Sequence, residues 1–295
     1  MADYMTTKEV AAHLRLNEKK IYAMATRGEI PAARVSGKWL FPRATVDAWI
    51  QRSTHIPTDR LLDSLLETTF VLQGSDDQVL DQALARYSAR EAIQVLTARV
   101  GSVAGLRALS TGRAHLAGCH LPGGAVREAV GGEGCYLLSL FRRSQGLIHD
   151  ASRTPGLRGL GDAVRRGLGI AGRQVDSGTW KLTLRLSKED GVSLEDLRVV
   201  ETFSSHVEVA LAVAGGRADV GVGSLLAATL GGLDFVPLAE EEFQLAVPSA
   251  LASHPRMVRL LEVVQDELQE SARAGVPGYS FSPLGHLETL SPASG

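Results

Sequence analysis

The sequence has few of the residues and segments that mark secreted, metal-binding or membrane proteins. It has only two cysteines, Cys119 and Cys135, and neither lies in a Cys-x-x-Cys motif or in a His/Cys cluster with ligand spacing. No apolar stretch approaches the roughly 20 residues that cross a bilayer. The N-terminus, MADYMTTKEV, has neither the basic start nor the apolar run of a secretory signal. We therefore expect a cytoplasmic protein with no membrane partner, no metal site and no cofactor.

A large net charge is also absent, but the average of −2 over 295 residues hides an asymmetry. Residues 1–55 contain nine basic and five acidic residues, a net charge of +4, and the remainder has a net charge of −6. A domain usually takes roughly 100–200 residues, so the length favours two domains. Any affinity for a polyanion such as nucleic acid should therefore belong to the N-terminal segment.

The N-terminal segment predicts two short helices joined by a tight turn. Thr6 and Thr7 precede KEVAAHLRL, in which apolar residues repeat at helical spacing, and Glu9 lies in the first turn. Asn17 is a typical N-cap for a second helix, NEKKIYAMATRG. That helix should end at Gly28, because glycine is favoured just beyond a helix C-terminus.

A hairpin and a third helix should follow. Residues 33–35 and 38–41 are predicted strands, and Ser36-Gly37 between them suits a tight turn. Residues 44–50 should then form a helix that packs under the first two. The segment therefore predicts a small closed unit in which the hairpin is a wing.

The order Thr-Thr-x-Glu-Val-Ala, Ile-Tyr, Arg-Gly-x-Ile-Pro-Ala, Gly-x-Trp-x-Phe and Trp-Ile resembles the excisionase-type winged helix-turn-helix over about residues 5–51. The resemblance implies that the second helix enters the major groove of double-stranded DNA and that the wing lies near the backbone or minor groove. The candidate DNA-binding residues are Lys19, Lys20, Ala23 and Arg27 on the helix, and Arg34 and Lys38 in the wing. On the residues alone, these cations could instead form an ordinary solvated surface.

Residues 54–68 are predicted to form a linker helix after Pro57. Four leucines, Leu61, Leu62, Leu65 and Leu66, would share one stripe of it. The stripe could pair two protomers, or it could pack on the next domain. A DNA reader this small gains affinity and half-site specificity by dimerising, so we expect a homodimer.

From Phe70 onward, short apolar runs alternate with amphipathic helices, which is typical of an open parallel sheet. Two predicted strands end in a Gly-Ser pair at the start of a helix, Gly74-Ser75 and Gly101-Ser102. Glycine lets a ligand approach the backbone, free N–H groups of the first turn can bind an anion, and the serine hydroxyl adds a donor. The same pairs could also be plain helix caps.

Two further loops meet helix starts in the same way. One contains Arg173, Ser177, Gly178 and Thr179, and the other contains Ser204, Ser205 and His206. Four polar loop-to-helix starts together predict a site for a small anion.

These segments resemble the periplasmic-binding-protein-like, type II domain that is related to molybdate- and tungstate-binding proteins, most clearly in GRAHLAGCHL, SQGLI, GRQVDSGT, GRADVGVG and LDFVPLAEEEFQLAVP. The resemblance implies an α/β domain over residues 69–295, with one lobe at about 69–147 and 240–295, a second at about 148–239, and hinge crossovers near Gly146-Leu147 and Leu238 to Phe243. Ligand would bind between the lobes. The implied ligand residues are Ser75, Ser102, Arg173, Ser177, Gly178, Thr179 and Ser205, with His206 and His120 as weaker candidates.

The sequence thus predicts a ligand-sensing transcription regulator. Its winged helix-turn-helix, mostly α with a β-hairpin wing, would occupy residues 1–53, and its two-lobed α/β domain would bind an oxyanion such as molybdate or tungstate. Trp180 stands where many members of the family have a basic residue, so a small organic metabolite is an alternative ligand. An architectural DNA binder without a ligand is another alternative. No nucleophile elbow or phosphate-binding Gly-x-x-x-x-Gly-Lys occurs, so we expect no enzyme.

Overall fold

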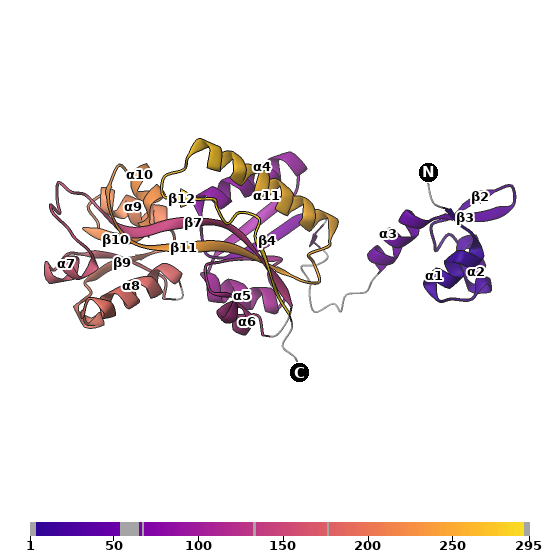
Figure 1. Cartoon of the computed structure of the whole chain (residues 1–295), viewed down its shortest axis with the longest axis horizontal. Helices are drawn as coiled ribbons and strands as arrows, with labels where there is room; N and C mark the ends of the chain where they lie inside the picture. The colour runs from indigo at the N-terminus through magenta and orange to yellow at the C-terminus, as the bar shows by residue number, and fades with distance from the viewer. Residues whose placement is uncertain (1–3, 54–64, 67, 132–133, 176, 292–295) are drawn as a thin grey trace. The chain divides into compact units, whose positions relative to one another are not determined.

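The computed structural model describes residues 4–53, 65–66, 68–131, 134–175 and 177–291 (Figure 1). Contacts between residues divide the chain into two compact units, Met1–Thr58 and Asp59–Gly295.

The helices of the N-terminal unit begin where the sequence predicts. α1 (Thr7–Leu14) starts with a capping box, in which the Thr6 hydroxyl accepts from the backbone N–H of Glu9 at 3.3 Å and the Glu9 carboxylate accepts from the N–H of Thr6 at 2.7 Å. α2 (Glu18–Thr26) is capped by Asn17, whose Oδ1 accepts from the N–H of Lys20 at 2.8 Å. Gly28 follows with a φ of +70°, the conformation that favours glycine after a helix.

A three-stranded antiparallel sheet and a third helix complete this unit. β3 (Lys38–Pro42) lies between β2 (Ala33–Val35) and β1 (Tyr4–Met5), and α3 (Arg43–Ser53) follows directly. The turn at Ser36 and Gly37 has positive φ at both residues, 48° and 82°, as a two-residue type I′ hairpin requires. The pairing of β1 with β3 is a feature that the sequence did not predict. The core is formed by Met5, Val10, Ala11, Ile21, Ala25, Ile30, Phe41 and Val46.

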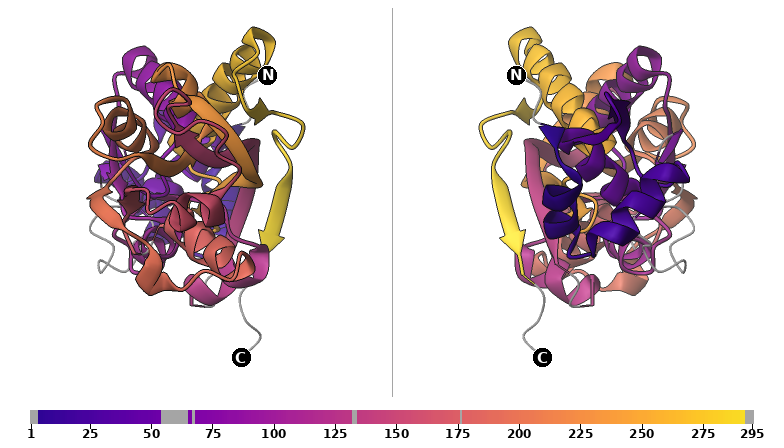
Figure 2. Two further views of the ribbon diagram at one scale, coloured as in Figure 1. Left: turned by 90° about the vertical axis from the view of Figure 1, so that its left-hand side faces the viewer. Right: turned by 90° about the vertical axis from the view of Figure 1, so that its right-hand side faces the viewer.

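The second unit is built on one ten-stranded sheet in the order β5-β4-β6-β11-β7-β10-β8-β9, with β12 and β13 also paired to β7. Figure 2 shows β13 lying along the outer side of β7. The strands are β4 (Thr69–Gly74), β5 (Gln94–Arg99), β6 (Leu116–Cys119), β7 (Cys135–His149), β8 (Ile170–Arg173), β9 (Val199–Phe203), β10 (Val220–Ser224), β11 (Asp234–Pro248), β12 (Tyr279–Ser280) and β13 (Leu287–Leu290).

Helices cover both faces of the sheet at each of its two ends, so the unit has two lobes (Figure 1). Lobe one combines the parallel strands β4, β5 and β6 with α4 (Gln78–Glu91), α5 (Ser102–Ser110), α6 (Gly123–Ala129) and α11 (Pro255–Ala274). Lobe two combines the parallel strands β8, β9 and β10 with α7 (Leu160–Arg165), α8 (Gly178–Glu189), α9 (His206–Ala214) and α10 (Leu225–Leu230), and a short 3-10 turn, Leu194–Asp196.

The lobes share β7 and β11, two antiparallel strands of 15 residues each. Their ladder is interrupted by register shifts between Pro237 and Ala239 and between Phe243 and Gln244. The segments predicted as hinge crossovers lie around these two irregularities.

The predicted linker helix lies largely outside the described residues, Leu61 and Leu62 included. Leu66 is described, and its side chain is buried in the lobe-one core beside Phe70 and residues of α4 and α11. Leu65 is 40% exposed. Leu66 therefore packs within the second unit. The sequence left this open as the alternative to a leucine stripe that pairs two protomers.

Candidate functional site

A small polar cavity, partly open to solvent, lies between the two lobes. Lobe one and the crossing strand β7 contribute Gly74, Ser75, Asp76, Arg99, Gly101, His120 and Arg143. Lobe two contributes Arg173, Gln174, Ser177, Gly178, Thr179 and His206. The cavity thus contains five of the seven ligand residues predicted from the sequence, Ser75, Arg173, Ser177, Gly178 and Thr179, together with both weaker candidates, His206 and His120.

Close backbone packing shapes the lobe-one wall. A Cβ atom on Gly74, whose φ is +138°, would lie 2.2 Å from the carbonyl oxygen of Gly118, so only glycine fits at the end of β4. The chain then turns, and the hydroxyls of Ser75 and Ser102 lie 2.8 Å apart in a hydrogen bond. The two Gly-Ser pairs therefore meet, although Ser102 is not among the residues that line the cavity.

The position of Ser75 differs in one respect from the prediction. α4 begins at Gln78, and its N-cap is Asp77, whose Oδ1 accepts from the N–H groups of Val79 and Leu80 at 2.8 and 3.1 Å. Ser75 therefore lies in the loop before the helix and not in its first turn. Asp77 is the better N-cap because its carboxylate satisfies two free N–H groups at once.

Helix starts form much of the lobe-two wall. Ser177 caps α8 by accepting from the N–H of Trp180 at 3.1 Å, and Gly178 and Thr179 form the first turn. Ser205 caps α9 by accepting from the N–H of Glu208 at 3.1 Å. Ser205 does not line the cavity, but His206, the first residue of α9, does. Trp180 is partly buried on α8 and is likewise not among the lining residues.

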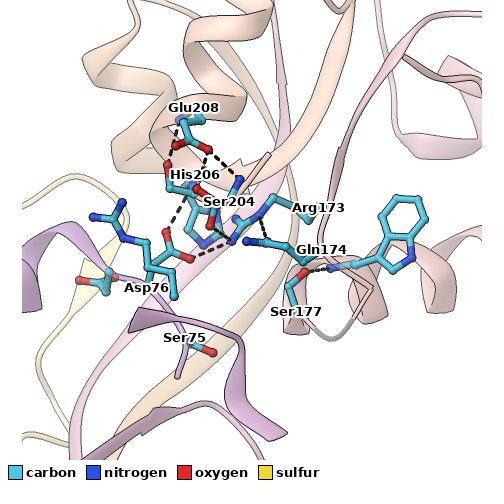
Figure 3. Close-up of polar contacts among 12 residues, drawn as sticks. Ser75, Asp76, Arg173, Gln174, Ser177, Ser204, His206 and Glu208 are labelled. Atoms are coloured by element: carbon cyan, nitrogen blue, oxygen red, sulfur yellow. Dashed lines mark hydrogen bonds and ion pairs between the residues drawn. The ribbon is translucent and has the colours of Figure 1, made fainter. Parts of the chain in front are cut away.

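Asp76 is a site residue that the sequence analysis missed. Its Oδ1 accepts from Nη2 of Arg173 at 2.8 Å, and its Oδ2 accepts from the backbone N–H of His206 at 3.3 Å. Figure 3 shows the carboxylate directed towards both groups from the opposite lobe. Burial opposes ionisation, but attraction to His206 in its protonated form, to Arg173 and to Arg143 holds the pKa of Asp76 well below its usual value. The N-terminus of α9 therefore already receives a carboxylate of the chain itself.

Arg143 forms a second buried ionic group behind Asp76. Its guanidinium donates to the Asp76 carbonyl oxygen at 2.7 Å, to Oδ2 of Asp77 at 2.8 Å and to Oε1 of Glu241 at 2.7 Å. Burial alone would lower the pKa of Arg143, but Glu241 and Asp77 raise it above the usual value, so the residue stays charged. Oε2 of Glu241 also pairs with Nδ1 of His120 at 2.9 Å.

Two buried nitrogens of the cavity residues have no hydrogen-bond partner in the described structure, Nη1 of Arg173 and Nδ1 of His206. The two residues are 5% and 1% exposed. Burial, followed by repulsion from Arg173 and Arg143, lowers the pKa of His206 to about 3, so its imidazole is neutral near neutral pH. An unpartnered buried polar atom costs about 1–3 kcal/mol, so both nitrogens are candidates for a hydrogen bond to a bound molecule.

The lobes touch at Gly178. A Cβ atom there would lie 1.7 Å from Cε1 of His120, which comes from the end of β6 in the other lobe. A glycine at this position therefore lets the first turn of α8 lie against the imidazole.

The described residues contain no group of three or more His, Cys, Asp or Glu that could hold a metal ion. Burial raises the pKa of the Cys119 thiol to about 12 and that of Cys135 to about 11, so both thiols are unreactive near neutral pH. No helix in the described part of the chain is long and apolar enough to cross a membrane.

The predicted DNA-binding residues lie on the surface of the N-terminal unit. Lys19 and Lys20 are exposed on α2, and Ala23 on the same helix is partly buried. The Arg27 guanidinium is exposed but donates to both carboxylate oxygens of Glu29, at 2.7 and 2.8 Å. In the hairpin, Lys38 is exposed, and the exposed Arg34 lies over the ring of Trp39 at 5.7 Å.

The fold and the cavity define a two-lobed ligand-binding domain that follows a small helix-turn-helix unit. The family models agree: residues 84–265 match the PBP superfamily domain and residues 4–54 match a helix-turn-helix domain. The chain belongs to the PBP superfamily domain family.

Known proteins are similar to this chain at low identity. The uncharacterized protein YvgK of Bacillus subtilis (strain 168) is 23% identical over 308 residues, which cover 96% of both chains. The effector-binding domain of QuiR in complex with shikimate has a TM-score of 0.50 at 10% identity, over 68% of this chain and 97% of that one. The tungstate ABC transporter protein of Geobacter sulfurreducens has a TM-score of 0.51 at 14% identity, over 69% and 97%. These two likenesses show the fold alone.

Proposed function

We propose that this protein is a cytoplasmic transcription regulator that binds double-stranded DNA as a homodimer and senses a small oxyanion between its two lobes. Molybdate and tungstate are the candidates that the sequence resemblance names. The observation that carries the sensing proposal is the pair of unpartnered buried nitrogens, on Arg173 and His206, in a polar cavity shared by both lobes.

The cavity offers the donors that an oxyanion needs. The first turn of α8, at Ser177, Gly178 and Thr179, lies at its wall, and free N–H groups at a helix N-terminus bind anions. Arg173 adds a permanent positive charge and the two N–H groups of Nη1, which have no partner in the described structure.

Binding would act by a population shift. Ligand that contacts both lobes binds the closed arrangement better than an open one, and only this difference in affinity can move the equilibrium. A change from 1:99 to 99:1 needs about 5.5 kcal/mol. The irregular segments of β7 and β11 are the proposed hinge.

Two alternative functions, a sensor of an organic metabolite and a DNA binder without a ligand, would require a different cavity. An organic metabolite would need apolar walls as well as polar ones, but Trp180, the side chain that suggested such a ligand, is not among the cavity-lining residues. An architectural DNA binder without a ligand would have no use for unpartnered donors on a cavity wall. The oxyanion is therefore the better-supported proposal.

The test is calorimetric titration of the purified full chain with molybdate, tungstate, sulfate and phosphate, in a buffer free of these anions. At least one should bind, and the bound protein should change its affinity for its DNA site. If none binds and a broad metabolite screen also leaves the melting temperature unchanged, the sensing proposal fails.

A further inference from the structure

The cavity that we assign to an oxyanion contains a carboxylate. Asp76 is 8% exposed, lines the cavity and is fixed at both oxygens, by Arg173 and by the N–H of His206. Such a group repels a bound anion unless the anion presents a hydrogen to it.

The charges around the cavity leave no surplus for a dianion. Arg143 and Arg173 are its buried cations, and Asp76, Asp77 and Glu241 are the buried carboxylates that contact them. His120 pairs with Glu241 and belongs to the same network. Arg99 is engaged by Asp81 at 2.9 Å. Two buried cations against three buried carboxylates leave the network without surplus positive charge before any ligand enters, unlike a cationic cage.

The cavity has both an unused hydrogen-bond donor and unused hydrogen-bond acceptors. Nη1 of Arg173 is a donor without a partner, so it requires an acceptor on the ligand. Each oxygen of the Asp76 carboxylate has two lone pairs and accepts one bond in the described structure, so each retains an acceptor site. A ligand oxygen that lies against Asp76 must therefore carry a hydrogen.

We propose that Asp76 makes the cavity selective for an oxyanion that keeps a proton, such as hydrogen phosphate, over fully ionised oxyanions such as sulfate, molybdate and tungstate. This inference rests on the proposed function and narrows its ligand class. Its physical basis is that a site built to hydrogen-bond a ligand hydroxyl rejects analogues without one, by about ten-thousandfold or more when the site's polar groups are left unpaired.

The experiment compares the wild-type full chain with Asp76→Asn by calorimetric titration at neutral pH. The wild type should bind inorganic phosphate at least about a hundredfold more tightly than sulfate, molybdate or tungstate. Asparagine has nearly the same shape without the charge, so Asp76→Asn should narrow this ratio to less than about tenfold, mainly by gaining affinity for the fully ionised anions. Asp162→Asn, which removes an ion pair with Arg166 on α7 outside the cavity, is the control and should keep the wild-type ranking.

The possible outcomes separate this inference from the proposed function. Wild-type protein that binds sulfate, molybdate or tungstate as tightly as phosphate overturns the inference and leaves the oxyanion sensor standing. If neither the wild type nor Asp76→Asn binds any of the four anions, both this inference and the assignment of the cavity to an oxyanion fail. If Asp76→Asn does not fold, the wild-type ranking alone decides.

Discussion

Nη2 of Arg173 lies 2.8 Å from Oδ1 of Asp76, and this buried ion pair joins the two lobes across the cavity. Arg173 ends a strand of lobe two, whereas Asp76 follows the first strand of lobe one. One contact thus belongs both to the ligand cavity and to the interface between the lobes, so substitutions here should change stability as well as affinity.

Loss of one partner of the Arg173–Asp76 ion pair should lower the free energy of unfolding more than loss of both. Arg173→Gln leaves the Asp76 carboxylate buried without its cation and should lower the free energy of unfolding by about 3 kcal/mol. Adding Asp76→Asn removes the stranded charge and should recover more than half of the loss. Urea denaturation of the two single variants and the double variant gives the coupling. Equal stability of Arg173→Gln and the wild type would show that the pair contributes nothing.

Stability should fall in mildly acidic solution because of His206. The ordinary pKa of a solvated histidine is 6.5 and that of His206 in the folded protein is about 3, so only the unfolded chain takes up this proton between those two values. Its contribution to stability is therefore complete above pH 6.5 and is lost as the pH falls towards about 3, with a slope of up to about 1.4 kcal/mol per pH unit. His206→Asn should flatten this slope in denaturation curves. His286→Asn, a change at an exposed histidine, should leave it as it is.

The second helix should carry much of the electrostatic affinity for DNA. The double substitution Lys19→Ala and Lys20→Ala should weaken binding and reduce the slope of log K against log salt by about 2, because each lysine that neutralises a phosphate releases roughly one counterion. Fluorescence anisotropy with a DNA fragment selected from a random pool measures both quantities. Lys181→Ala with Lys188→Ala, two exposed lysines on α8, is the matched control. An unchanged salt slope in the first variant would remove α2 from the interface.

A methyl group at the lobe contact should hinder closure. Gly178→Ala places a Cβ atom 1.7 Å from Cε1 of His120, so either the imidazole would have to move or the lobes would have to separate. We expect at least about a tenfold loss of ligand affinity, since binding depends on the closed population. His120→Ala in the same chain makes room for the methyl group and should restore part of the affinity. Small-angle X-ray scattering of the full chain gives an independent measure of lobe separation. If Gly178→Ala changes neither the ligand affinity nor the scattering, the contact is contradicted.

Local signals in the sequence predicted the elements well. Thr6, Asn17 and the Ser36-Gly37 turn gave the correct helix starts and hairpin, because caps and two-residue turns depend on neighbours in the chain. Ser177 and Ser205 were found for the same reason, and both prove to be caps. A local pattern does not show whether a capped helix start also faces a cavity. Ser177 lines the cavity and Ser205 does not, although both are caps.

The charged residues of the site could not be predicted from local signals in the sequence. Asp76 is followed by Asp77, and the pair GSDD has the composition of an ordinary helix start. Arg143 is preceded by Arg142, yet the first is 2% exposed and the second remains on the surface. Only the pairing of β7 with β11, about a hundred residues away along the chain, brings Glu241 to Arg143. The roles of these residues follow from contacts between segments that the sequence alone does not bring together.

The two strands shared by the lobes also set the mechanics of closure. Because β7 and β11 stay hydrogen bonded to each other along most of their length, a turn of one lobe against the other should twist these two strands together. The ladder is weakest at its two register shifts, so the twist should concentrate there. We expect the twisted strands to act as a spring, which would return the lobes to their resting arrangement once the ligand leaves.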